Sequence, residues 1–373
     1  MTTERHPPAP LGSPWDNPAP EVSEPLRPNA AGLSKARLAD LLKAKGEPAF
    51  RGTQVFEGLY KHRWTAWDSF TNLPKVLRDS LQSEWALAWP EIVESLPSAD
   101  GSTKHAFRLA DGKLVEGVHM PYGTRTTLCL SSQVGCAMGC TFCATGQMGI
   151  VRNLTAQEIV GQVMAMLTAH GHQAPLPVNL VFMGMGEPMH NLEHVMEAFE
   201  ILTNASGLAI PPRRITVSTC GLVNGIEKLA RYQKRPRLAV SLNGTTNEYR
   251  SRIMPVNRVW NLEALAAALK AFPLEHDERI TLEYVLLKGL TDSPEDARRL
   301  AAIAHSFPSK INLIPFNAHD GSGFEEPGEE RLNEFGKLLV ARGLTVSVRR
   351  SRGQDVAGAC GQLVREGRKK LSL

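Results

Sequence analysis

The chain has 373 residues, a formal net charge of +4 at pH 7 and 42% hydrophobic residues, a composition typical of a folded globular protein. It contains no apolar run near the roughly 20 residues that a membrane helix requires, and no apolar signal-peptide core at its N-terminus. Its six cysteines, three of them within eight positions, do not suit a secreted disulfide framework. We therefore expect a cytoplasmic protein without membrane contact, and a monomer, since no heptad seam argues for assembly.

The N-terminal part of the chain divides into a tail and a helical region. Residues 1–32 are rich in proline and alanine and poor in large apolar side chains, which is typical of a disordered tail. Ser34 then precedes apolar residues at helical spacing, and helical patterns also fit residues 53–61 and 74–82. We predict a small helical accessory domain over residues 33–90, with RNA binding as its candidate function. Its aromatic residues fit a hydrophobic core better than base-stacking platforms, and they are Phe50, Phe56, Tyr60 and Trp64.

The rest of the chain alternates between strand-like and helical patterns. Runs within residues 91–125, separated by the turn signals Asp100-Gly101 and Asp111-Gly112, predict a β-hairpin extension with a small antiparallel sheet. Over residues 126–350, strands alternate with helices, which indicates βαβ units and a parallel sheet. The predicted strands are residues 126–131, 178–183, 214–218, 237–242, 279–287 and 310–315. This α/β pattern fits a partial (β/α)6 barrel and also a doubly wound open sheet.

Basic residues gather in several clusters along the chain. They are Arg213 with Arg214 and residues 231–237, 250–258, 349–352 and 365–370, the last within the C-terminal segment 351–373. Each cluster alone is explained equally well by a solvated helix face or strand end. Together they suit a phosphate backbone, which indicates nucleic acid as a partner.

Three cysteines carry the strongest chemical signal. Cys136, Cys140 and Cys143 lie in the run CAMGCTFCATG, directly after the first predicted strand, with the spacing C-x3-C-x2-C. A [4Fe-4S] cluster held by protein alone takes four cysteines, so three leave one iron open to a small molecule. A structural zinc knuckle is the alternative, but it would usually need a second Cys or His pair at a matching distance. The spacing therefore favours a cluster with one open iron.

Polar residues follow the ends of the later predicted strands. In GMGEP, Gly186 allows a ligand to approach the backbone and Glu187 can accept a hydrogen bond from a ligand ammonium, although a tight turn with a solvated Glu fits as well. Three further strand ends carry Ser218, Ser241-Leu242-Asn243 and Asn317, which taken singly are turn or cap residues. Two cysteines stand apart from the loop, Cys129 within the first strand and Cys360 near the C-terminus. Either one alone is more often an inert buried side chain.

The order of these motifs resembles one family across residues 34–365. The run CL-SSQVGCAMGCTFCATG, with Phe142 before its last cysteine, is followed by GMGEP, SLN, NLIPFN and ACGQL. It is similar to the radical S-adenosylmethionine (SAM) methyltransferases that modify C2 of adenine in large-subunit ribosomal RNA and in certain tRNAs. The resemblance implies a partial (β/α)6 radical SAM barrel with a [4Fe-4S] cluster and SAM as cofactors. It also implies ribosomal RNA and tRNA substrates and an electron donor of flavodoxin type.

The resemblance assigns a role to each candidate residue. Cys136, Cys140 and Cys143 bind the cluster, and the residues implied to contact SAM are Gly186, Glu187, Ser218, Ser241, Leu242, Asn243 and Asn317. Cys360 carries a methyl group as S-methylcysteine, and Cys129 releases the product by forming a transient disulfide with Cys360. Glu116 is implied to accept the proton from C2, and burial among apolar strand residues would raise its pKa, although the sequence also allows an outward-facing strand Glu. Cys220 is expected only to pack.

Two alternatives stay open at this stage. A relative that methylates C8 and confers resistance to ribosome-targeting antibiotics shares the same cysteines, and the position of the product methyl separates it from the C2 enzyme. From a different class, the chain fits a non-catalytic RNA-binding protein with zinc at the three cysteines. Metal analysis separates that alternative, because it predicts zinc without sulfide.

Overall fold

The computed structural model describes residues 28–172, 177–319 and 322–363. Most of the predicted disordered tail (residues 1–32) and the basic residues 365–370 lie outside the described residues. No helix among the residues described is both long and apolar enough to cross a membrane.

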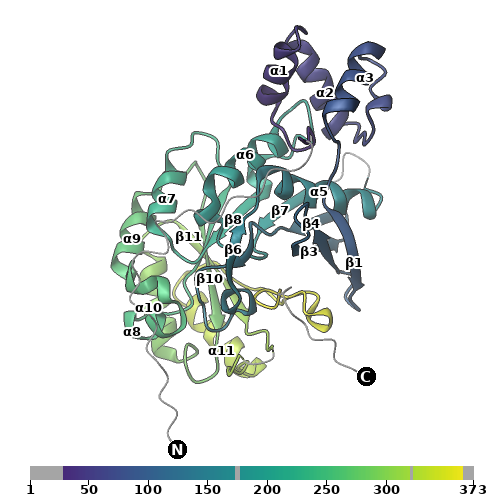
Figure 1. Ribbon diagram of the computed structural model, residues 1–373. Coiled ribbons are helices and arrows are strands. Elements are labelled where there is room, and N and C mark those ends of the chain that lie inside the picture. The colour runs from purple at the N-terminus through teal and green to yellow at the C-terminus, as the bar shows by residue number, and fades with distance from the viewer. Residues whose placement is uncertain (1–27, 173–176, 320–321, 364–373) are drawn as a thin grey trace, which may run out of the picture.

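Three helices form the N-terminal region, at one end of the molecule (Figure 1). They are α1 (Lys35–Ala44), α2 (Phe50–Tyr60) and α3 (Lys75–Glu84). Ser34 caps α1 as expected, because its Oγ accepts a hydrogen bond from the backbone N of Arg37 at 3.3 Å. Phe56 and Tyr60 are fully buried in the core, but Phe50 is 55% exposed, so its predicted core role is wrong. Phe50 is the first residue of α2, and a residue at a helix end can point away from the packed face.

One ten-stranded sheet forms the body of the protein, in the order β1-β2-β3-β4-β7-β8-β9-β10-β11-β12. The first four strands, β1 (Glu91–Pro97), β2 (Thr103–Arg108), β3 (Leu114–Tyr122) and β4 (Arg125–Cys129), pair antiparallel. The predicted small antiparallel sheet is thus not separate. It continues into the main sheet, because the tight turn after β3 lays that strand directly along β4.

From β4 onward, neighbouring strands of this sheet are parallel. The strands are β7 (Val178–Phe182), β8 (Ile215–Thr219), β9 (Arg237–Ser241), β10 (Ile280–Leu286), β11 (Ser309–Pro315) and β12 (Val346–Val348). Six parallel strands were predicted, and the three-residue β12 adds a short seventh. β12 lies at the edge opposite β1, so the sheet does not close on itself. This is the predicted partial α/β barrel.

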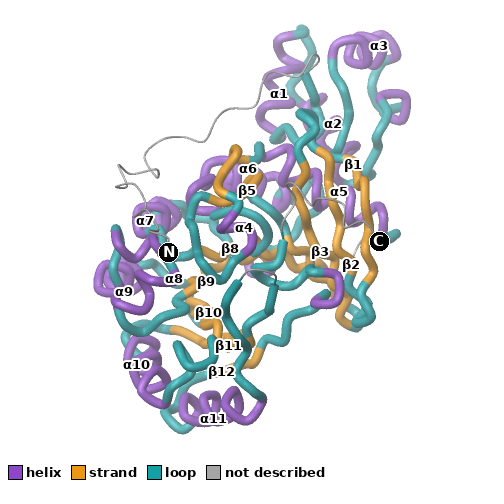
Figure 2. The backbone as a smooth tube through the Cα atoms, turned by 60° about the horizontal axis from the view of Figure 1, so that its bottom comes forward, coloured by secondary structure: helices purple, strands orange, loops and turns teal. Residues whose placement is uncertain are grey.

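The remaining long helices connect the parallel strands and lie on the outer side of the curved sheet (Figure 2). They are α5 (Ala156–Ala169), α6 (Leu192–Thr203), α7 (Val223–Ala230), α8 (Asn247–Ile253), α9 (Leu262–Ala271), α10 (Pro294–Ala304) and α11 (Glu329–Val340). Capping boxes begin two of them, Thr155 with Glu158 at α5 and Ser293 with Asp296 at α10. With helices outside, the carboxyl ends of the parallel strands are left for a site.

A two-stranded sheet frames the cysteine loop. It consists of β5 (Gln133–Cys136) and β6 (Gly149–Asn153), with the short helix α4 (Ala144–Gln147) between them. The expectation that the loop directly follows the first strand is therefore wrong, since β4 ends at Cys129 and β5 intervenes. The two strands are short and pair only with each other, so their sequences carry little strand signal.

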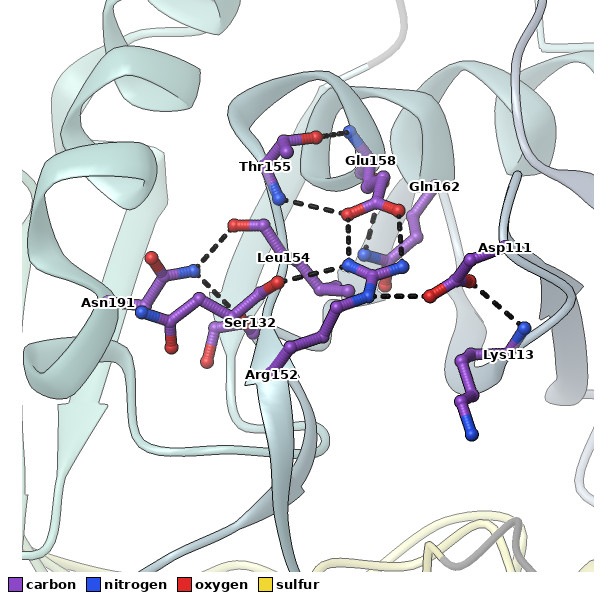
Figure 3. A network of polar contacts seen from close by, with 10 residues as sticks. Asp111, Lys113, Ser132, Arg152, Leu154, Thr155, Glu158, Gln162 and Asn191 are labelled. Atoms are coloured by element: carbon purple, nitrogen blue, oxygen red, sulfur yellow. Dashed lines mark hydrogen bonds and ion pairs between the residues drawn. The ribbon is translucent and has the colours of Figure 1, made fainter. Parts of the chain in front are cut away.

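Buried polar contacts hold this hairpin in place (Figure 3). Arg152 of β6 donates to both carboxylate oxygens of Glu158, at 2.8 and 2.9 Å, and to Asp111 at 2.8 Å. Asp111 belongs to the turn between β2 and β3, and Glu158 lies in the first turn of α5. The side-chain amide of Asn191 donates to the carbonyls of Ser132 and Leu154, both at 2.7 Å. Contacts with Asp111, Glu158 and Asn191 thus fix the hairpin that carries the cysteine loop.

Candidate active site

The three loop cysteines line one cavity at the carboxyl ends of the parallel strands, called here the inner cavity. It is lined by Cys136, Met138, Cys140, Phe142, Cys143, Phe182, Met183, Gly184, Gly186, Glu187, Ser218, Thr219, Cys220, Ser241, Asn243, Met254, Glu283, Val285, Ile314, Phe316, Asn317, Cys360 and Gly361. Burial raises the pKa of each loop cysteine, and nearby thiols raise it further, from the loop itself for Cys136 and Cys140 and from Cys360 for Cys143. The structure therefore brings the three together, as the spacing predicted.

The donor set of this loop fits an iron–sulfur cluster. Thiolates are the ligands that such clusters take. Among the described residues, no three His, Cys, Asp or Glu side chains converge on one point, as a single metal ion would require. A [4Fe-4S] cube does not need that convergence, because each thiolate binds a different iron. Three cysteines around one cavity thus suit a cube with one iron left without a cysteine ligand.

The GMGEP segment lies in the inner cavity. Gly186 has a φ of +103°, and a Cβ there would lie 2.6 Å from the Cβ of Gln133, so only glycine fits. The Glu187 carboxylate accepts hydrogen bonds from the backbone N atoms of Met189 at 3.0 Å and Cys220 at 2.8 Å. Burial raises the pKa of Glu187. The alternative of a solvated Glu in a turn is therefore wrong, since Glu187 is buried.

The other predicted strand-end residues lie in the same cavity, with one exception. Ser218 donates to the Glu283 carboxylate at 2.8 Å, and the side-chain amide of Asn317 donates to the carbonyl of Cys360 at 3.0 Å. Ser241 and Asn243 also line the cavity. Leu242 does not, because its side chain points into the hydrophobic core. Leu242 and Asn243 lie beyond Ser241, the last residue of β9, and Asn243 has a φ of +50°, so the chain turns at this point.

Cys129 and Cys360 meet at a second cavity of about 310 Å³, called here the outer cavity. It is lined by Val118, Met120, Tyr122, Arg125, Thr127, Cys129, Asn179, Met183, Arg349, Arg350, Ser351, Arg352, Gly358, Ala359, Cys360 and Leu363. Cys360 and Met183 line both cavities. Cys360 thus lies where the two cavities adjoin, with the loop cysteines on one side and Cys129 on the other.

The two thiols share an electrostatic environment. Burial raises the pKa of Cys129 to about 12 and also raises the pKa of Cys360, while the Arg349 guanidinium opposes both shifts. Arg349 is held by Glu283, whose carboxylate accepts from its Nη1 at 3.1 Å. The same Nη1 lies 2.9 Å from the sulfur of Met183. Arg349 is therefore a fixed positive charge beside both thiols.

The segment that carries Cys360 is anchored on both sides. On one side, the Asp355 carboxylate accepts from Ser98 Oγ at 2.5 Å and from the backbone N of Ala99 at 3.0 Å, in the turn between β1 and β2. On the other side, the backbone N of Ala144, beside the loop cysteines, donates to the carbonyl of Gly361 at 2.7 Å. Cys360 is thus fixed relative to the cysteine loop.

Glu116 lies close to this segment but lines neither cavity. It is buried in β3, so the outward-facing alternative is wrong. Its carboxylate lies 3.3 Å from the ammonium of Lys104, which also donates to the carbonyl of Ala357 at 3.2 Å. The expected apolar surroundings are therefore incomplete, because a buried cation faces the carboxylate.

Two buried residues of the site escaped sequence-based reasoning. Cys220 lines the inner cavity, so packing does not describe its whole environment. Arg250, assigned to a basic surface cluster, is fully buried and donates to the carbonyl of Cys220 at 2.6 Å. Arginine is rarely buried, and the pattern of α8 gives no signal that it would be.

Two family models match the chain. Residues 130–301 match the radical SAM superfamily, and residues 28–87 match the ribosomal RNA large subunit methyltransferase N-terminal domain. The crystal structure of a radical SAM methyltransferase from Sphaerobacter thermophilus is similar with a TM-score of 0.85 and 42% identity, and the match covers 91% of this chain and 100% of that one.

Named relatives match over nearly the whole chain. Dual-specificity RNA methyltransferase RlmN 2 of Myxococcus xanthus is 45% identical over 360 residues, which cover 93% of this chain and 95% of that protein. RlmN of Geotalea uraniireducens is 48% identical over 327 residues, which cover 86% of this chain and 92% of that protein. With this identity and coverage, and with the cysteine loop at the carboxyl ends of a partial barrel, the chain belongs to the dual-specificity RNA methyltransferase RlmN family of radical SAM enzymes.

Proposed function

We propose that this radical SAM methyltransferase modifies C2 of an adenosine in large-subunit ribosomal RNA and of an adenosine in tRNAs, and that Cys360 carries the methyl group. One observation supports the proposal above the others, the position of Cys360 between the inner and outer cavities. A methyl carrier has to meet SAM on one side and the target base on the other. A thiol that lines both cavities suits that task.

Within the inner cavity, Cys136, Cys140 and Cys143 would hold the cluster. The residues that would surround SAM are Gly186, Glu187, Ser218, Ser241, Asn243 and Asn317. When bound, SAM supplies an electrophilic methyl group and, together with the cluster, a carbon radical that abstracts a hydrogen atom. The buried Glu187 carboxylate would accept a hydrogen bond from the SAM ammonium.

The first task of Cys360 is to accept a methyl group. Its thiol loses a proton to solvent, and its sulfur bonds to the methyl carbon while the bond from that carbon to the sulfonium breaks with its electron pair. Only the thiolate is a good nucleophile. Burial opposes that form, and Arg349 favours it, so the guanidinium supports this step.

Release of the product falls to Cys129. The methylene carbon on Cys360 bonds to C2 as a radical, so the adduct then has to lose the C2 proton and one electron, which the oxidised cluster would accept. The Cys129 thiolate next attacks the Cys360 sulfur, and the carbon–sulfur bond breaks with its electron pair on carbon as the disulfide forms. The electron pair left on carbon takes up a proton and completes the methyl group. Glu116 is proposed to take the proton that leaves C2. Because Glu116 lines neither cavity, this role requires the carboxylate to move toward the outer cavity, whose wall includes Val118, two residues further along β3.

The outer cavity is proposed to hold the target adenine. Its volume of about 310 Å³ is at the small end of ligand pockets and suits one base taken out of its stack. Exposed Tyr122 lies at its rim, with the Arg125 guanidinium 6.0 Å from the ring centroid. Arg350 and Arg352 add positive charge for phosphates. An electron donor of flavodoxin type, a monomeric state and a cytoplasmic location complete the proposal.

The test is anaerobic incubation of unmodified ribosomal RNA and tRNA with reconstituted protein, SAM and a reductant, followed by mass spectrometry of nucleosides. The proposal expects 2-methyladenosine, and 8-methyladenosine would instead assign the C8 reaction. Cys360→Ala should retain iron and sulfide but form no methyladenosine. Full activity of Cys360→Ala would refute the carrier role.

A further inference from the structure

Arg250 is a buried positive charge with only neutral partners. Its side chain, on α8, is 0% exposed. The guanidinium donates to the carbonyl of Leu242 at 2.9 Å, to Oδ1 of Asn257 at 2.9 Å and to the carbonyl of Cys220 at 2.6 Å. Each nitrogen of the guanidinium thus donates one hydrogen bond, but none of the three acceptors carries a negative charge.

A second buried arginine, Arg152, has the carboxylate partners that Arg250 lacks. Arg152, 4% exposed, forms ion pairs with Asp111 and Glu158, both at 2.8 Å. Among the ion pairs of the described residues, Arg250 is in none. Removing a charge from water costs several kcal/mol unless an opposite charge compensates. Burial accordingly lowers the pKa of Arg250, and Cys220 and Cys140 are the groups that act against this shift.

The inner cavity has the opposite imbalance. Among the described residues, its lining contains the carboxylates of Glu187 and Glu283 and the three loop cysteines, but no Lys, Arg or His; Arg349, outside this lining, pairs with Glu283, whereas Glu187 and the cysteines have no cation in the lining. Three thiolates outweigh the positive charge of an oxidised [4Fe-4S] core, so the bound cluster is net anionic, and reduction makes it more so. Cys220 lines this cavity, and its carbonyl accepts from Arg250. The guanidinium thus lies one residue behind the cavity wall, on the Cys140 side.

We propose that Arg250 is the built-in counter-charge of the [4Fe-4S] cluster, and that it raises the midpoint potential of the cluster by favouring its reduced state. The net charge and hydrogen bonding around a cluster set its potential. The positive charge stabilises the reduced cluster more than the oxidised one, since the reduced form carries the larger negative charge. Burial of Arg250 away from water keeps this interaction unscreened.

The experiment is a redox titration of the anaerobically reconstituted holoenzyme without SAM. Electron paramagnetic resonance measures the amount of reduced cluster at each potential. Arg250→Gln removes the charge but keeps an amide donor, whereas Arg250→Lys keeps the charge. We expect Arg250→Gln to lower the ratio of reduced to oxidised cluster at least tenfold at a fixed potential, which is about 59 mV for a one-electron couple. Arg250→Lys should lose less than half of that shift. Arg331→Gln, which alters an exposed arginine of α11 paired with Glu334, should keep the wild-type potential.

Each result decides the proposal. A wild-type potential in Arg250→Gln overturns it, and so does an equal fall in both Arg250 variants, because geometry rather than charge would then be responsible. Iron and sulfide analysis shows whether each variant carries the cluster, and circular dichroism shows whether it folds. If Arg250→Gln folds but loses the cluster while Arg250→Lys retains it, the proposal is supported. If Arg250→Gln does not fold while Arg250→Lys does, the charge serves the fold, and the proposal is overturned.

Discussion

Replacing Lys104 by methionine tests how the enzyme holds its proposed proton acceptor. The Lys104 and Glu116 side chains are only 4% and 2% exposed, with 3.3 Å between the ammonium and the carboxylate. Removing one partner of a buried ion pair leaves an uncompensated charge and typically costs about 3–5 kcal/mol. Lys104→Met also takes the donor from the Ala357 carbonyl. We therefore expect a loss of unfolding free energy of about 3–5 kcal/mol at pH 7.

The double variant Lys104→Met with Glu116→Gln separates this effect from catalysis. It removes both charges, so it should recover most of the stability that Lys104→Met loses, and the two changes should be strongly non-additive. It should nevertheless form no methyladenosine, because a glutamine cannot accept the C2 proton. Stability without activity would thus assign the Glu116 carboxylate to proton transfer, since the charge pair is dispensable for the fold.

Anaerobic urea unfolding of the holoenzymes, followed by circular dichroism, gives the stability, and nucleoside mass spectrometry gives the activity. The exposed ion pair of Lys288 with Glu325 provides a matched control. Lys288→Met should change the unfolding free energy by less than about 1 kcal/mol. Wild-type stability in Lys104→Met would refute the buried pair, and methylation by the double variant would refute Glu116 as the proton acceptor.

Three further predictions concern the cysteines and the buried histidines. Cys129→Ala should leave RNA covalently joined to Cys360, and a denaturing gel without this adduct would contradict the resolving role. Arg349→Gln removes the positive charge that lowers the pKa of Cys360, so this pKa should rise. Methylation of Cys360 by SAM should therefore be slower at pH 7 and regain its rate as the pH rises. An unchanged pH profile would exclude this role. Burial lowers the pKa of His105 to about 4 and of His119 to about 3, so only the unfolded chain takes up these protons just below pH 6.5. The free energy of unfolding should therefore be highest above pH 6.5 and fall toward pH 4. His119→Gln should make the midpoint of thermal unfolding depend less on pH over this range.

The parallel sheet was predictable because most of its strands are short runs rich in apolar residues that alternate with helical segments. Residues 178–183, for example, were expected to form a strand, and β7 covers Val178–Phe182. The strands β5, β6 and β12 were not predicted. Each is short, and each depends on a partner strand, β5 and β6 on each other and β12 on β11, which local periodicity does not report.

Site residues were likewise predictable where their role depends on near neighbours in the sequence, and not where it depends on distant ones. Cys136, Cys140 and Cys143 were identified from their spacing, since their chemistry depends on neighbours within one loop. The partners of Glu116 and Arg250 come from other elements, Lys104 from β2 and Cys220 from the end of β8. In a sequence, a charged residue indicates solvent or nucleic acid. Only the assembled fold shows which charges lie inside.

The anchoring of Cys360 bears on how one thiol could serve two cavities. A flexible carrier would lose effective concentration at both cavities, because every freed residue adds conformational entropy. Here the carbonyl of Cys360 accepts from Asn317 at 3.0 Å, and Asp355 holds the preceding turn against Ser98. The backbone is thus held, and rotation about the side-chain bond of Cys360 would be enough to turn the thiol from one cavity to the other. Loosening the anchor should therefore hinder both uses of Cys360 equally. Asp355→Ala should slow methylation of Cys360 and its disulfide formation with Cys129 by similar factors, and loss of only one of them would contradict this account.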